Sequence, residues 1–177
     1  MFFARRTGMK NKIILAVLVA LSIFSATACS NTESEETAPT SPYITESSII
    51  EEYKQQEIAN LLERWTFSYS THDLLTYNDC VTMELEFPDN SEHNQPHTAN
   101  YFDTVTDCKI IDIDFKNAKT SEDKIYTIPV KYTITYNEEF KEENGLRKGE
   151  NTVSATMSIK ENSVGYLFIS GIENNIE

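Results

Sequence analysis

Residues 125–136, IYTIPVKYTITY, decide the fold because they alternate apolar or aromatic side chains with mostly threonine and lysine. A period of two is typical of a half-buried β-strand, in which successive side chains point to opposite faces of a sheet. Pro129 has no backbone N–H to give to a neighbouring strand, so it indicates an edge or a bulge. The face that we expect to meet the core carries Tyr126, Ile128, Val130, Tyr132, Ile134 and Tyr136.

Three further segments in the C-terminal half are predicted to be strands. Turn residues at Asn144-Gly145 and Glu161-Asn162 separate the later segments. Contiguous strands with short connections predict an antiparallel meander. In the first segment we expect Ile111 and Ile113 to share one face and Asp112 to lie on the other. The three segments are residues 108–115, 151–159 and 164–172.

A long amphipathic helix is predicted upstream of these strands. Ser48 and Glu51 fit a capping box, in which a serine begins a helix and a glutamate follows three residues later. A short helix at 74–79, a short strand at 81–87 and a third helix capped by Thr98 follow it. Helices followed by strands predict an α+β fold, with the helices packed on an antiparallel sheet. The apolar stripe of the long helix consists of Ile50, Tyr53, Ile58, Leu61, Leu62, Trp65 and Tyr69.

Residues 1–28 have the order of a secretory signal peptide. Lys10 and Lys12 precede an apolar run, residues 13–24, and small residues follow up to position 28. The run has 12 residues, fewer than the about 20 that cross a bilayer. The small residues and Cys29 resemble the lipobox of a bacterial lipoprotein, with translation starting at Met1 or Met9. The resemblance implies that Cys29 carries a diacylglycerol that holds the protein at the outer face of the cell membrane; ordinary cleavage, with this cysteine incidental, is the alternative.

The composition separates a tether from a single domain. Residues 30–42, SNTESEETAPTSP, contain no aromatic residue and cannot bury enough apolar surface to fold. We therefore expect residues 29–45 to form a lipidated flexible tether and residues 46–177 a single α+β domain. Without residues 1–28 the chain keeps 11 basic and 28 acidic residues, a net charge of −17. This charge excludes nucleic acid as a natural partner, and it fits either simple solubility or a cationic partner.

The order of predicted elements over residues 46–175 resembles the nuclear-transport-factor-2-like superfamily, whose domains are cone-shaped. The resemblance implies a curved sheet that wraps the long helix and leaves a pocket between them. Some members are isomerases or dehydratases with an aspartate in the pocket, and many only bind ligands or partners. Asp112 is the candidate base, although we expect it to face water. The candidate pocket lining, which can equally fill the core, is Trp65, Tyr69, Tyr132 and Tyr136.

The remaining candidate groups give weaker signals. Cys80 and Cys108 suggest a disulfide in an exported protein, with two separate buried thiols as the alternative. His93 and His97 have a spacing that suits zinc on a helix, but Pro96 lies between them and favours a solvated loop. We expect no metal and no cofactor, because no phosphate-binding glycine motif or catalytic elbow is present.

These observations favour a non-enzymatic, membrane-anchored module that binds a small ligand or another envelope protein. Two alternatives stay open at this point. One is a pocket enzyme of isomerase-like or hydrolase-like type, and the other is a structural subunit of a secretion or conjugation assembly. A redox role is disfavoured because no Cys-x-x-Cys pair occurs.

Overall fold

The computed structural model describes residues 40–87 and 99–175. The predicted signal peptide, Cys29, most of the tether, the pair His93 and His97, and Thr98 lie outside the described residues. None of the described helices is both long enough and apolar enough to cross a membrane.

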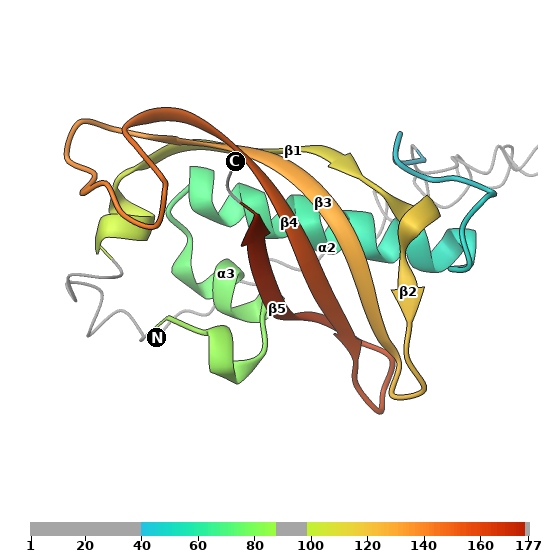
Figure 1. The fold of residues 1–177 in the computed structure, drawn as a ribbon. Helices are drawn as coiled ribbons and strands as arrows, with labels where there is room; N and C mark the ends of the chain where they lie inside the picture. The colour runs from blue at the N-terminus through green and yellow to red at the C-terminus, as the bar shows by residue number, and fades with distance from the viewer. Residues whose placement is uncertain (1–39, 88–98, 176–177) are drawn as a thin grey trace, which may run out of the picture. The chain divides into compact units, whose positions relative to one another are not determined.

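Helices α2 (Glu52–Ser70) and α3 (Leu74–Cys80) precede an antiparallel sheet. The sheet has five strands in the order β1-β3-β4-β5, and β2 pairs with β3 beyond the end of β1. Figure 1 shows the sheet curving around α2, with α3 beside β5. The α+β fold, with helices packed on a curved antiparallel sheet, is confirmed and is consistent with a nuclear-transport-factor-2-like cone. The strands are β1 (Val105–Ile113), β2 (Lys119–Thr120), β3 (Ile125–Tyr136), β4 (Gly149–Glu161) and β5 (Leu167–Asn175).

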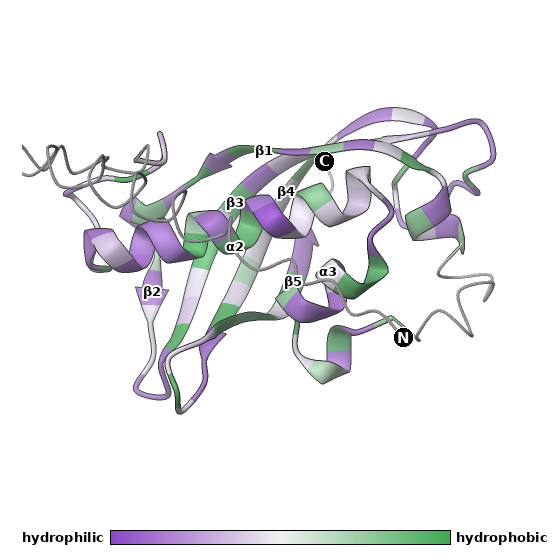
Figure 2. Ribbon diagram, turned by 180° about the vertical axis from the view of Figure 1, so that it is seen from behind, coloured by the Kyte–Doolittle hydropathy of each residue, from purple (hydrophilic) through white to green (hydrophobic). Residues whose placement is uncertain are grey.

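Strand β3 has the predicted bounds and the predicted buried face. Ile128 pairs with Met157 and Tyr132 pairs with Val153 of β4, and all four side chains are buried. Figure 2 shows apolar and polar residues alternating along these strands. The alternation places one apolar face of the sheet against the apolar stripe of α2 and leaves threonine, serine and lysine on the other face.

Pro129 lies inside the sheet and not on an edge strand. Its carbonyl accepts a hydrogen bond from the Asp114 backbone N–H at 2.9 Å. The nitrogen of a strand residue faces the same side as its carbonyl, so the missing donor of Pro129 points to the place where β1 has ended and β2 has not begun. Pro129 therefore cannot return a bond to Asp114, and β1 ends one residue earlier, at Ile113.

One prediction for a connecting segment and one for a face of β1 are wrong. Residues 81–87 are not a strand: Val81 makes an isolated bridge with Ile169, and the 3₁₀ turn η1 (Met83–Leu85) follows. The alternating pattern there misled because Met83, which the pattern would bury, is exposed. Ile111 is 45% exposed, since a bulge in β1 between residues 110 and 112 turns it outward.

Among the described residues, two other irregular turns lie between α3 and β3. The π-helical turn η2 (Ala99–Asp103) stands where the third helix was predicted. The 3₁₀ turn η3 (Phe115–Asn117) follows β1 and buries Phe115. The predicted strand 108–115 therefore ends two residues early, and it begins three residues before Cys108.

The long helix begins later than the capping box predicts. Helix α2 starts at Glu52, and the side chain of Glu51 makes no cap hydrogen bond. The Ser48 hydroxyl instead accepts a hydrogen bond from the Ile50 backbone N–H at 3.0 Å. Residues 40–50, which we call the strap, run along the helix. The strap belongs to the same compact unit as the helices and the sheet.

Gln55 fastens the strap to the helix. Its side chain is 1% exposed, and its Oε1 accepts a hydrogen bond from the Thr45 backbone N–H at 2.9 Å. Its Nε2 donates to the carbonyls of Thr45 at 2.9 Å and Ile50 at 2.7 Å. A buried amide that meets three backbone groups satisfies them without a regular secondary structure.

We expect Gln55→Ala to lower the free energy of unfolding by about 2 kcal/mol, because it leaves three backbone groups of the strap without partners. Urea unfolding followed by the fluorescence of Trp65, the single tryptophan, measures the loss.

The matched control is Gln56→Ala. The Gln56 side chain is half-buried and holds only the Ser41 backbone N–H and a surface contact with Asn60. Its removal should cost less than about 1 kcal/mol. Equal losses in the two variants would show that Gln55 has no special role.

Candidate functional site

The four predicted pocket residues fill the interior of the cone. Trp65 and Tyr69 project from α2, Tyr132 and Tyr136 project from β3, and all four are buried. The Trp65 ring, 2% exposed, meets the rings of Tyr69 and Tyr132 edge to face with centroids 5.4 Å apart. Of the two interpretations of this set, core filling is the one that the structure supports.

Aromatic residues from other segments close the interior further. Tyr69 stacks on Phe102 of η2 at 4.9 Å between centroids, and Tyr77 of α3 packs edge-on against both rings. Tyr136 stacks on Phe140 at 3.8 Å. Edge-to-face and offset-stacked rings are favourable packing arrangements. The sequence analysis missed Tyr77, Phe102 and Phe140 as interior residues, because they lie in short segments without a long periodic pattern.

Asp112 faces water at the β1 bulge, as expected, and it pairs across the strands with Lys131. Among the described residues, none of the buried polar side chains is a carboxylate. A general base in the cone would need such a buried carboxylate, so the interior offers no acid for the predicted enzyme chemistry.

His72 and Asp73 stabilise the turn between α2 and α3. The Nε2 atom of His72 lies 2.7 Å from the Val105 carbonyl oxygen, and its φ of +55° places it in the left-handed region. The Asp73 carboxylate accepts hydrogen bonds from the backbone N–H and the hydroxyl of Thr76, which lowers the pKa of this carboxyl. These contacts are those of a helix cap.

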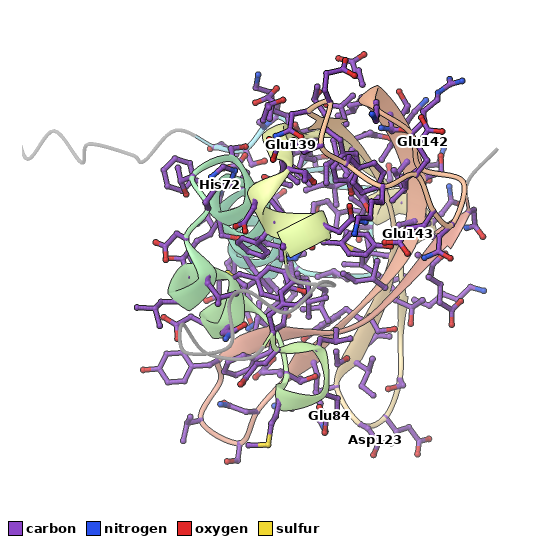
Figure 3. The ribbon with its side chains drawn as sticks, turned by 90° about the vertical axis from the view of Figure 1, so that its left-hand side faces the viewer. His72, Glu84, Asp123, Glu139, Glu142 and Glu143 are labelled. Carbon is purple, nitrogen blue, oxygen red and sulfur yellow. The ribbon has the colours of Figure 1, made fainter. Side chains whose placement is uncertain are left out.

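The labelled polar residues do not converge on one site. Figure 3 shows His72, Glu84, Asp123 and the three glutamates of the β3–β4 loop at separate places on the surface. No three described residues of the metal-binding types lie close enough to hold an ion together.

Cys80 and Cys108 are free, buried thiols in the structure, and the expected disulfide is not formed. The Cys80 Sγ accepts a hydrogen bond from Arg64 Nε at 3.2 Å. The backbone N–H of Cys108 donates to Ser70 Oγ at 2.8 Å, which ties β1 to the end of α2. Each cysteine thus packs in its own part of the fold. Burial raises the pKa of the Cys108 thiol to about 12.

Lys54 is a buried charge on α2. Its Nζ lies 2.6 Å from a carboxylate oxygen of Glu57 and 3.4 Å from one of Glu161. Glu161 also pairs with Lys124 at 3.3 Å and accepts a hydrogen bond from the Tyr126 hydroxyl. Every charge in this cluster has a partner, so it joins α2 to the β3–β4 pair and leaves little capacity for a ligand.

Two hollows flank the exposed side of α2. The larger one, which we call the strap groove, has a volume of about 590 Å³ and lies between the strap and the helix. The smaller hollow, about 340 Å³, lies between the helix and residues 165–167. Asn60 contributes to both hollows. The strap groove is lined by Thr40, Ser41, Pro42, Ile44, Glu52, Tyr53, Gln56, Asn60 and Glu63.

Comparisons with known protein families and with curated proteins gave no match. The interior is filled with aromatic rings, and the two hollows open at the outer surface beside α2.

Whether Cys80 and Cys108 are free can be tested by counting reactive thiols. In denaturant without reductant, Cys80 and Cys108 should both react with Ellman's reagent, and neither should react in the folded protein because both are buried. The chain with Cys29→Ser is used so that only these two thiols are present. A count of zero after unfolding would instead show a disulfide.

Stability should fall in alkaline solution. Burial raises the pKa values of Tyr69, Tyr132 and the Cys108 thiol. Folding therefore favours their protonated forms, and the unfolded chain releases these protons at a lower pH than the folded chain. The free energy of unfolding should be insensitive to these groups below about pH 8 and should fall as the pH rises above about 9.

Urea midpoints measured between about pH 8 and about pH 11 test this expectation. Tyr132→Phe removes one of the buried phenols and should make the alkaline decline shallower. Tyr166→Phe changes an exposed ring and should leave the decline as in the wild type. The same decline in all three proteins would rule out the buried phenol as a cause.

Proposed function

We propose that this chain is a bacterial lipoprotein, held at the outer face of the cell membrane by a lipid on Cys29. In this proposal its folded part is a nuclear-transport-factor-2-like domain that acts as a non-enzymatic protein-interaction module. The order of basic, apolar and small residues before Cys29 supports the anchor. Two acyl chains hold a protein stably at a membrane, where one chain is marginal.

The filled interior of the domain is the main support for a protein-interaction module. Trp65, Tyr69, Tyr132 and Tyr136 occupy the space between helix and sheet where a pocket enzyme would bind its substrate. A small-molecule site is normally a preformed concave space. The hollows beside α2 are open and lie on the outer surface, which suits contact with another macromolecule.

The pocket-enzyme alternative lacks support from the described residues. It requires a buried carboxylate of raised pKa with a histidine or tyrosine in reach, whereas Asp112 is exposed on β1. The structural-subunit alternative is a special case of a protein-interaction module, and a partner found at the outer surface would decide between them.

The anchor is tested by Cys29→Ser in cells. The wild-type chain should stay with the membrane fraction after a carbonate wash and should incorporate an alkyne-labelled fatty acid. The variant should incorporate no label and should be lost from the washed membranes, because the cysteine thiol is the acceptor of the lipid.

Cys80→Ser serves as the matched control, because it removes a thiol that lies inside the fold. It should keep both the label and the membrane retention. Retention of an unlabelled Cys29→Ser chain on washed membranes would contradict the proposed anchor.

A further inference from the structure

The walls of the strap groove are held in place before any partner binds. The Ser41 backbone N–H donates to Gln56 Oε1 at 2.8 Å. The Tyr43 hydroxyl donates to the Ile110 carbonyl at 3.2 Å, which fastens the strap to β1 as well as to α2. A preformed groove avoids much of the ordering cost that weakens binding by mobile segments.

Two carboxylates on the helix wall are unpaired. Glu52 and Glu63 line the groove and are exposed, and neither has a lysine or arginine within ion-pair distance in the described part of the chain. The groove lining itself contains no basic residue. Glu57, on another side of the helix, pairs with Lys54: its carboxylate oxygen lies 2.6 Å from the lysine Nζ. The groove is therefore where α2 leaves its negative charge uncompensated.

Apolar and polar groups lie between these carboxylates. Tyr53 is 61% exposed, and the Lys54 Nζ lies 5.4 Å from its ring centroid. This distance is suitable for a cation–π contact, so the ring already meets one cation. Pro42 and Ile44 supply apolar surface on the strap side. The Asn60 side-chain NH₂ makes no hydrogen bond within the described residues and can donate to a partner carbonyl.

We infer that the strap groove binds an extended, cationic segment of a partner protein, with lysine or arginine side chains on Glu52 and Glu63. This inference rests on the proposed function and names the partner of that module. The net charge of −17 draws a cationic partner toward the domain. The unpaired carboxylates then fix its position in the groove.

The spacing of the two carboxylates specifies the partner. Positions 52 and 63 lie on one line of the helix, because eleven residues make about three turns. At about 1.5 Å per residue they are about 16 Å apart. An extended chain rises about 3.3 Å per residue, so the two cationic side chains should be about five residues apart.

The test uses the mature lipidated chain in neutral detergent and fluorescein-labelled synthetic peptides. The first probe is a glycine–serine peptide of about ten residues with two lysines about five positions apart. The second has glutamates at these positions, and the third has the lysines adjacent. Fluorescence anisotropy at low salt measures the affinity, and added salt should weaken it.

The spaced lysine peptide should bind, the glutamate peptide should not, and the adjacent lysines should bind more weakly. Glu52→Gln with Glu63→Gln should weaken binding by about fivefold or more, as expected for two exposed ion pairs. The control, Glu84→Gln with Glu139→Gln, removes the same charge from exposed positions on η1 and the β3–β4 loop (Figure 3). It should keep the affinity within about twofold.

Three results would overturn the inference: no binding of the spaced lysine peptide, equal weakening in both double variants, or equal affinity for both lysine spacings. The second would mean that net charge alone attracts the peptide. The assay uses purified protein, so it is independent of the cellular test of Cys29. A chain that is labelled and retained on membranes but fails to bind the peptide would refute the groove and leave the anchored module standing.

Discussion

The packing of Trp65 against the curved sheet is the contact on which the rest of the structure depends. The indole is the largest fully buried side chain, and it meets Tyr69 on its own helix and Tyr132 on the central strand β3. A sheet of this size can bury one face only if something fills its concave side. The ring of Trp65 and its aromatic neighbours supply that volume, and the helix is therefore held at a distance set by aromatic side chains.

The parts of the fold with a clear period could be predicted from the sequence. Strand β3 follows the alternation of residues 125–136 to the residue, because its buried face meets both the helix and the neighbouring strands. The parts that depend on distant contacts could not. The start of α2 is set by Gln55, which bonds to residues 45 and 50 and leaves the local serine–glutamate signal unused. The bulge at Ile111 leaves no mark in the sequence pattern of β1.

The candidate site, like the fold, could be predicted only where the sequence has a clear period. The four aromatic residues repeat at helical and strand spacing in the sequence, and all four are buried in the structure. Whether they line a space or fill it depends on Tyr77 and Phe102, which come from short segments with no long pattern. The strap groove was missed because four of its nine lining residues lie in the segment that was assigned to a flexible tether.

The strap also determines how the domain would carry a mechanical load. A pull that reaches the domain from its N-terminal side enters at residue 40 and passes along the strap to Gln56 and Gln55. These hydrogen bonds join the strap to the first turns of the core helix, so the force is delivered to α2 and not to the edge of the sheet. Peeling an edge strand breaks its bonds one after another, whereas this route would load the most deeply packed element first. The strap thus passes a load applied at residue 40 directly to the packed core of the domain.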